Sequence, residues 1–567
     1  MKLMKATYKL LPVLLVVFFA SCDEHLTDLN VNPNGVNPGE VNPNLMVPAI
    51  ITSTAQYYLD ESYQGGTAGV MQYVQKSGWG SELNKYDWDG AQGWATQYNN
   101  LRNAKHLYGR SVEEGMEFQQ GLAIVMRAFN FAYIADSWGD APYTAALNAI
   151  EGSQEDLFPA FDSQEAIYKG IIEELKQANM LLSKSSGEYS GMNESADLIY
   201  SGSPSHWRKM ANSLLLRYYM RVSEKLPDYA KAGIEEIVSN PGQYPVFTSI
   251  DDDATMGFVG SSDGDSWPAN TTYDASESEF DRIQLCAGFR DVLVDFNDPR
   301  LAVWFNKVEV QIKVSGEHAE DDIVVDGVRY LRPDYMEANN LVVYNKETWV
   351  GDIEAGKTLV DTMEYAGLPI ASTTGDGSGW NLNPNKIQGG PNVHNSALDD
   401  KYKEAEGDML QARLISYAEV CFILAEAAQK GWSVGSQQEW YENGVKASFD
   451  TWEVSDDYDA YMAKTGTAFD GSLEQIMVQK WIANWTVAHE SWCDWKRTGY
   501  PDLTIGTKGV RKAMPLRYQY GSDEIARNAD NYSNAVEGLE ETSFTATDGK
   551  DSAWSKFWLI QGTGKPY

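Results

Sequence analysis

Amphipathic helical patterns recur through the first and last thirds of the chain, and this recurrence restricts the fold more than any other feature. Residues 118–135, 164–182 and 205–226 each place apolar side chains three and four positions apart, so that they share one helix face. Residues 408–430 repeat the pattern, and a capping box opens a further helix over residues 472–495. The helices follow one another as pairs without a fixed repeat length. The sequence therefore predicts a mostly α protein built from helix pairs.

The middle of the chain, residues 240–405, lacks these patterns. It is rich in Gly, Asp, Asn and Pro and contains two short β-like runs, at 308–314 and 323–330. So long a region without strong elements is uncommon in a compact domain unless its loops serve function. We expect one domain, residues 49–567, with a helical scaffold mainly at 49–240 and 405–500 that supports a loop-rich insert at about 240–405.

The first residues have the pattern of a secretory signal peptide. Lys2, Lys5 and Lys9 precede an apolar run over residues 10–20, which ends in small residues. The run is too short to cross a bilayer, which needs about 20 apolar residues, and no later run approaches that length. We expect residues 1–21 to be removed.

Cys22 directly follows the small residues Ala20 and Ser21, where a bacterial lipoprotein carries its lipid. Phe19 stands where Leu is usual, so the motif is relaxed, and ordinary secretion with an incidental Cys22 is the alternative. Acyl chains at Cys22 would anchor the protein firmly. Residues 22–48 are predicted to be a lipidated terminus and an extended leash, because the Pro/Asn/Gly run at 30–48 disfavours helix.

Charge and cysteine content exclude other classes. The formal net charge of −36 argues against nucleic acid as a partner and against electrostatic adhesion to anionic lipid. Beyond Cys22, the cysteines are Cys286, Cys421 and Cys493, an odd number that cannot fully pair. We expect three buried thiols, with one disulfide as the alternative.

Catalytic and cofactor motifs are weak, and the sequence predicts no enzyme. Residues 260–264 fit G-x-S-x-G, but they lie in a turn-rich stretch without the strand and helix that a nucleophile elbow needs. His489 and Glu490 lack the second histidine of a zinc-protease helix. The acidic run at 251–253 offers oxygens to calcium, but without EF-hand spacing a solvated loop is favoured. We therefore expect no catalytic residue, cofactor or metal.

Aromatic residues are abundant, with 18 Trp and 32 Tyr, and those in loops are the candidates for ligand binding. A glycine-flanked indole beside Asp and Asn suits carbohydrate, because the ring packs on C–H groups while amides and carboxylates bind hydroxyls. The alternative for each is that it only pins a loop to the body. The candidates are Trp79, Trp88, Trp94, Trp267, Tyr273, Trp380 and Asn381.

Five separated blocks along the chain form a further pattern. They are LNVNPN (29–34), FAYIADSWGDAPY (131–143), NDPRL (297–301), LISYAEVCFILAEAA (414–428) and QKWIA (479–483) leading to WKRTGYP (495–501). Each block alone is weak, but their order along nearly the whole chain is specific. Together they resemble the SusD/RagB family of nutrient-binding lipoproteins of the outer membrane.

The resemblance implies four tetratricopeptide-like helix pairs beneath a variable loop-rich half. It also implies a SusC-like TonB-dependent transporter, over which the lipoprotein forms a hinged lid at the cell surface, and Asp23–Glu24 is similar to an acidic surface-export signal. Ligand residues lie on variable loops and cannot be carried over. The blocks quoted belong to the scaffold, so Asp136, Asp140, Tyr143, Arg497 and Tyr500 are expected to be structural.

The expected function is therefore capture of an oligosaccharide for a transporter. A peptide ligand is one alternative. A surface glycoside hydrolase is another, but it needs two carboxyl groups flanking the bond, and nothing in the sequence selects a pair. A third is a capping subunit without ligand contacts.

Overall fold

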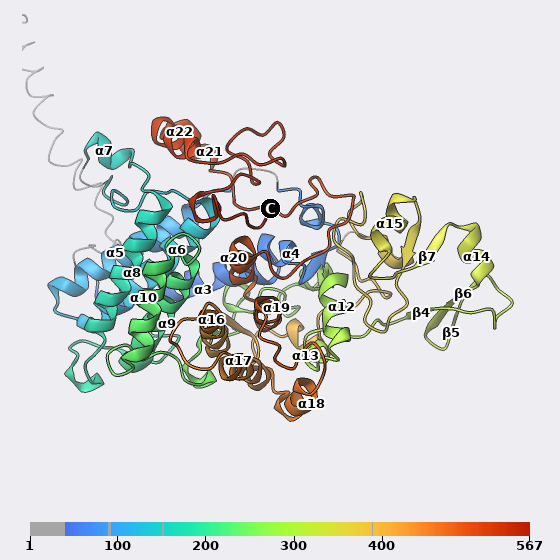
Figure 1. Cartoon of the computed structure of the whole chain (residues 1–567), viewed down its shortest axis with the longest axis horizontal. Coiled ribbons are helices and arrows are strands. Elements are labelled where there is room, and N and C mark those ends of the chain that lie inside the picture. The colour runs from blue at the N-terminus through green and yellow to red at the C-terminus, as the bar shows by residue number, and fades with distance from the viewer. Residues whose placement is uncertain (1–39, 89–91, 150–151, 388) are drawn as a thin grey trace, which may run out of the picture.

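The computed structural model describes residues 40–88, 92–149, 152–387 and 389–567, and the predicted signal peptide, Cys22 and most of the leash lie outside them. One end of the molecule is a stack of antiparallel helices (Figure 1). Neighbouring helices pack side by side in the order α5, α6, α8, α9 and α10. The bounds are α5 Ala95–Glu113, α6 Glu117–Trp138, α8 Gln164–Leu181, α9 Pro204–Arg221 and α10 Pro227–Ser239.

A second helical group comes from the last third of the chain. It contains α16 (Tyr417–Gln429), α17 (Gln437–Thr451), α19 (Leu473–Ala483) and α20 (Ala488–Thr498). The helix α3 (Val47–Tyr63) contacts α5 and α6 of the first group and α20 of the second. The prediction of a mostly α fold with tetratricopeptide-like helix pairs is therefore confirmed.

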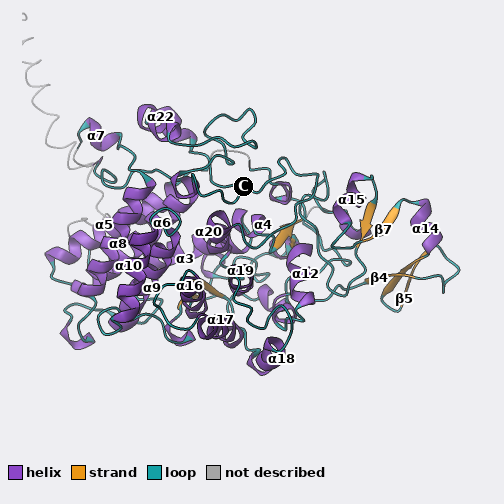
Figure 2. Ribbon diagram, viewed as in Figure 1, coloured by secondary structure: helices purple, strands orange, loops and turns teal. Residues whose placement is uncertain are grey.

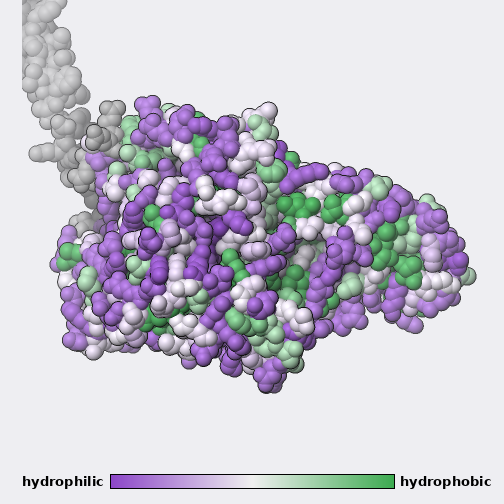
Figure 3. Space-filling model, viewed as in Figure 1, coloured by the Kyte–Doolittle hydropathy of each residue, from purple (hydrophilic) through white to green (hydrophobic). Residues whose placement is uncertain are grey.

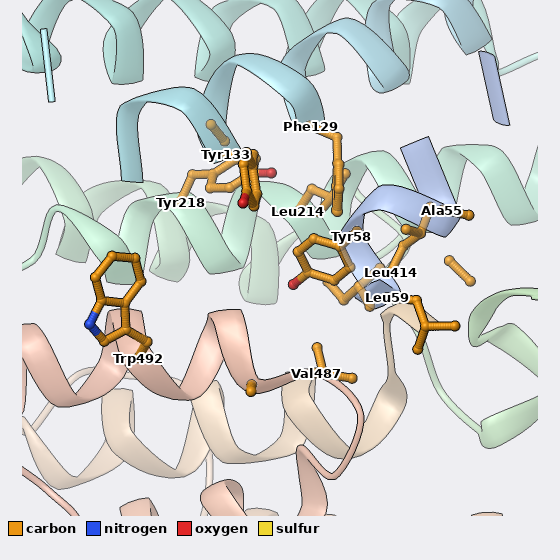
Figure 4. Packing of buried hydrophobic residues seen from close by; sticks show 14 of the residues in the cluster. Ala55, Tyr58, Leu59, Phe129, Tyr133, Leu214, Tyr218, Leu414, Val487 and Trp492 are labelled. Atoms are coloured by element: carbon orange, nitrogen blue, oxygen red, sulfur yellow. The ribbon is translucent and has the colours of Figure 1, made fainter. Parts of the chain in front are cut away.

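The shared core lies where the two groups meet (Figure 4). Tyr58 of α3 packs edge-on against Phe129 and Tyr133 of α6, with ring centroids 5.0 and 6.3 Å away. Leu214 of α9 and Trp492 of α20 are fully buried in the same cluster. Full burial of one such side chain contributes about 1.5–3 kcal/mol, so this core holds both helical groups together.

Buried charges cross the same boundary. Arg217 of α9 forms a two-pronged contact with Glu419 of α16, with a shortest distance of 2.5 Å. The next turn of α9 carries Arg221, which pairs with Glu490 of α20 and lies 3.5 Å from Asp136 of α6. Four helices from both ends of the chain are thus linked by paired charges, as the scaffold role of Asp136 requires.

The loop-rich half carries only short strands, and β4 to β7 lie in a part that projects from the helical body (Figures 1 and 2). Strand β4 pairs in parallel with β6, which also pairs antiparallel with β5. Of the predicted β-like runs, the first is strand only from residue 311 and the second is the two strands β5 and β6 joined by a turn. The strands are β1 Val74–Lys76, β2 Ala254–Gly257, β3 Ile283–Leu285, β4 Gln311–Val314, β5 Asp322–Val325, β6 Val328–Leu331, β7 Leu341–Val343, β8 Thr358–Val360 and β9 Gln411–Ile415.

Short helices fill the remaining connections. They are α4 Gly66–Val70, α7 Gln154–Leu157, α11 Ser278–Asp281, α12 Ala287–Asp295, α13 Arg300–Trp304, α14 Pro333–Ala338, α15 Trp349–Glu354, α18 Tyr458–Met462, α21 Ser522–Arg527 and α22 Ala529–Glu537. No helix in the described ranges is long and apolar enough to span a membrane.

Three sequence-based boundaries are wrong. The run at 408–430 is not one helix, because residues 411–415 form β9 and Ser416 caps α16 by accepting a hydrogen bond from Glu419. The run at 472–495 is two helices, interrupted where Thr486 adopts a positive φ of 70°. The leash ends earlier than residue 48, since Pro48 lies in the first turn of α3, where its missing N–H costs nothing.

The three described cysteines agree with the prediction of buried thiols. Cys286, Cys421 and Cys493 are all free and buried. Burial raises the pKa of the Cys286 and Cys421 thiols to about 12. These side chains are therefore protonated core residues.

Candidate functional site

Four of the seven candidate binding residues lie inside the protein. Trp267 is fully buried, with its ring centroid 4.7 Å from that of Tyr63. Asn381 is 2% exposed and holds two loops together, since it accepts from the Asp361 N–H and donates to the His394 carbonyl. Because the Trp267 ring is packed among other rings and the Asn381 amide is engaged by protein groups, the prediction for these two residues is corrected to a packing role. Trp267 and Asn381 each fix a loop to the body of the protein.

Trp88 and Trp94 are covered as well. Trp88 stacks on Tyr518 with ring centroids 4.6 Å apart. Trp94 donates its indole N–H to Glu524 over 3.2 Å, and its edge lines a small groove of about 420 Å³ beside α21. Their indole faces are used by packing in this structure.

The other three candidates lie at the surface of the loop-rich half. Trp79 is 69% exposed on a turn between Gly78 and Gly80, both with positive φ, so that the turn requires glycine at each side. Tyr273 is 43% exposed, and its hydroxyl donates to the Gly260 carbonyl over 3.0 Å. Trp380 is half-buried. These three side chains are therefore at least partly exposed.

A cleft of about 650 Å³ lies in the same half and is the candidate binding site. All its lining residues fall between 280 and 403, within the loop-rich region singled out from the sequence. Tyr365 gives it a half-buried aromatic side chain, and the hydrogen-bonding groups around it come from α11, β3 and three loops. The polar lining residues are Asp281, Gln284, Asn306, Lys307, Glu309, Asn392, Asn395, Asp400 and Lys403.

Two of these exposed aromatics, Trp380 and Trp79, contact segments that form the cleft wall. The indole N–H of Trp380 donates to Oδ1 of Asn395 over 3.0 Å, and Asn392 donates to the Trp380 carbonyl. The Trp79 ring lies against Arg282, which directly follows Asp281.

Tyr273 stands in a loop that supports α11. The neighbouring Asp274 accepts hydrogen bonds from the Glu279 N–H and the Ser278 hydroxyl at the start of this helix. The three rings are therefore attached to the frame of one cleft, although they come from separate loops.

The charges of the cleft are unevenly paired. Lys307 pairs with Glu364 at 2.6 Å, and Lys403 lies 3.5 Å from Asp400 and 3.7 Å from Glu277. Burial, together with the carboxylate of Glu277, raises the pKa of the Asp281 carboxyl to about 6, although Lys403 opposes the shift. The cleft thus offers oxygen acceptors more freely than cationic donors.

The structure gives no support to a catalytic or metal site among the motifs considered. Ser262 caps a short turn by bonding with Asp265, which explains the G-x-S-x-G match as loop geometry. In the acidic run, Asp252 pairs with Lys209 at 2.7 Å and Asp253 accepts the Tyr417 N–H at 2.6 Å. These carboxylates are already engaged by protein.

One cluster of metal-ligand types does occur in the described residues, formed by Asp136, His489 and Cys493. It is fully buried beside two cations, since Arg221 lies 3.5 Å from Asp136 and Lys496 donates to the Asp136 carbonyl over 2.7 Å. Because these cations already compensate the carboxylate, we assign the cluster to the scaffold.

The cleft residues themselves were missed by the sequence analysis, which looked for aromatic rings. Gln284 lies in a three-residue strand whose pattern is too short to detect, and Tyr365 stands 81 positions further along the chain. The one available signal was the run Pro391–Asn395, which places two Asn in a loop soon after Trp380. This run identifies its own loop but does not indicate which residues lie next to that loop in the folded protein.

Comparisons with known proteins agree on one family. The family model SusD-like_2, described as "Starch-binding associating with outer membrane", matches residues 34–329 and 338–521. No curated protein matches the chain.

Solved structures share the fold. A chitin-binding protein aligns with a TM-score of 0.67 and 23% identity over 93% of this chain and 100% of its own. A SusD homologue from Bacteroides fragilis aligns at 0.66 and 18% over 92% and 100%, and a chitin-binding SusD homologue from Flavobacterium johnsoniae at 0.65 and 21% over 89% and 97%.

Proposed function

The chain belongs to the SusD-like family of outer-membrane-associated binding proteins, and on that premise we propose that it captures an oligosaccharide in the cleft beside Tyr365 and delivers it to a SusC-like TonB-dependent transporter. Membership makes it a binding protein and not an enzyme. The hydrolase alternative is therefore set aside.

The observation that carries the proposal is the lining of the cleft. Tyr365 offers an aromatic ring and a hydroxyl, while Gln284 and Asp281 offer oxygen acceptors on the adjoining wall. A sugar presents C–H faces together with many hydroxyl donors, and this combination matches such a lining. Two structural neighbours bind chitin, which makes β-linked glycans a natural first panel.

The open rings extend the contact surface. Trp380 is oriented by Asn395 of the cleft wall, and Trp79 and Tyr273 stand on adjoining loops. A chain of several sugar units that leaves the cleft would pass over these rings. This arrangement supports a glycan longer than the cleft itself.

Anchoring and transport complete the proposal. A lipid on Cys22 would keep the protein beside its transporter, and residues 23–39 would supply the slack for a lid to swing. The family description associates members with the outer membrane, which supports this location.

The test is binding of the chain from Cys22 onward to soluble starch, chitin and xylan oligosaccharides, with peptides as a second panel, measured by isothermal titration calorimetry. The double variant Tyr365→Ala/Gln284→Ala should lose at least about tenfold in affinity for the ligand that binds. Tyr108→Ala, which alters a half-buried tyrosine of α5, is the matched control. Unchanged affinity in the double variant, or binding to peptides alone, would refute the proposal.

A further inference from the structure

The two lysines that line the cleft already have acidic partners. Lys307 is paired with Glu364, and Lys403 lies between Asp400 and Glu277 and over the ring of Phe280. An anionic sugar entering the cleft would therefore have to compete with carboxylates that already hold both ammonium groups.

Two carboxylates on the lining remain without such partners. Among the described residues, neither the carboxylate of Asp281 nor that of Glu309 forms an ion pair or a side-chain hydrogen bond. The groups that act on Asp281 are Glu277 and Asp274, which are also acidic, and Lys403, which is shared. The field in this part of the cleft is consequently negative.

A buried acceptor points to the same kind of ligand. Gln284 is only 2% exposed and lines the cleft three residues after Asp281. Its Oε1 atom has no hydrogen-bond partner in the described structure. A buried acceptor without a partner is unfavourable, so a donor supplied by a ligand would stabilise the complex.

We propose that the cleft selects a glycan carrying free amino groups, that is, hexosamine units, with Asp281 as the counter-ion of the ammonium and Gln284 as a second acceptor. This inference rests on the proposed function, because it specifies the sugar held at the same site. An ammonium supplies three donors and a positive charge, whereas an acetamido group supplies one donor and no charge. A uronate would add a third negative charge beside the unpaired carboxylates of Asp281 and Glu309.

The experiment compares matched hexamers of glucosamine, N-acetylglucosamine and galacturonic acid by calorimetry at pH 7 and about 0.15 M salt, where long-range attraction is largely screened. The glucosamine hexamer should bind about tenfold more tightly than the acetylated one, and the galacturonate hexamer should not bind. Asp281→Asn should abolish the preference, so that the glucosamine and acetylated hexamers bind this variant with equal affinity.

A control is needed because the protein, with a net charge of −36, attracts any polycation. Asp408→Asn removes the same charge from an exposed residue outside the cleft lining and should keep the preference. Equal affinities for the two hexamers, or an unchanged preference in Asp281→Asn, would overturn the inference while the proposed function stands. Failure of every glycan to bind would overturn both.

Discussion

The guanidinium carbon of Arg282 lies 5.6 Å from the centroid of the Trp79 indole ring. The residue before it, Asp281, lines the cleft. Two consecutive residues thus connect an exposed aromatic ring to the wall of the binding site. This pair connects the cleft with its exposed edge at Trp79, which we call the outer rim.

Trp79→Ala should lower affinity for long oligosaccharides about fivefold, because one sugar–aromatic contact of about 1 kcal/mol is lost. Affinity for a disaccharide, which fills only the cleft, should not change. Calorimetry with two-unit and six-unit ligands distinguishes the two effects. If both lengths lose affinity equally, Trp79 belongs to the cleft itself and the rim has no separate role.

Trp267→Ala should destabilise the protein by about 3–5 kcal/mol, because it leaves a large cavity among Tyr63, Phe258 and Tyr402. Urea unfolding followed by fluorescence measures the change. Trp79→Ala is the matched control and should shift the unfolding free energy by less than about 0.5 kcal/mol. A small effect at Trp267 would show that this indole is not a core residue.

Glu490→Gln should cost about 3–5 kcal/mol, because it leaves Arg217 and Arg221 undercompensated in the core. Glu337→Gln, an exposed substitution, should be neutral. Differential scanning calorimetry provides the comparison. Equal melting temperatures for the two variants would argue that the buried charges are not stabilised by their pairing.

The same network should make stability depend on acid. Burial alone would raise the pKa of the Glu490 carboxyl, but the guanidinium groups of Arg217 and Arg221 lower it from 4.5 to about 2. A carboxyl with a depressed folded-state pKa contributes stability above its unfolded pKa and loses it as the pH falls through the folded value. The free energy of unfolding should therefore decrease between pH 4.5 and 2, and less so in Glu490→Gln.

Binding should have a separate dependence on pH. Because the pKa of Asp281 is raised to about 6, its carboxyl is charged at pH 7 and mostly protonated at pH 5. The contribution of Asp281, measured as the ratio of the glucosamine-hexamer affinities of the wild type and of Asp281→Asn at each pH, should accordingly decline over this interval. The ratio cancels the titration of the ligand's own amino groups, and a constant ratio would assign the titration to another group.

Cys22→Ala should release the protein from membranes, since the lipid anchor is predicted at this thiol. Fractionation of cells followed by immunoblotting measures it, with Trp79→Ala as a variant that should stay in the membrane fraction. Full retention of Cys22→Ala would exclude lipidation there as the means of anchoring.

Sequence periodicity predicted the scaffold well because each long helix buries one face against its neighbours. The pattern at 164–182, for example, predicts a helix, and α8 spans Gln164–Leu181 with Ser163 as its cap, accepting a hydrogen bond from the Ala166 N–H. The same periodicity failed at Leu410 and Leu414, which are four residues apart as in a helix, yet Leu414 lies in strand β9. Pairing with β2 overrides the local preference there.

The site was predictable only as a region. Trp267 and Trp380 have similar glycine- and proline-rich surroundings in the sequence, yet one is fully buried and the other half-open. Which loop aromatic becomes buried depends on partners such as Tyr63 and Tyr402, which are far away in sequence. The cleft itself joins Gln284, Tyr365 and Asn395, and no local pattern connects these residues.

The charge pairs between α9 and the last third of the chain bear on the order of synthesis. Arg217 is made 202 residues before its partner Glu419, and Arg221 is made 269 residues before Glu490. Until those partners exist, packing α9 into its final place would bury two guanidinium groups without compensation, at a cost of several kcal/mol per ion. This arrangement disfavours completion of the core before the last third of the chain is present, and such a delay would suit the export that the predicted signal peptide implies.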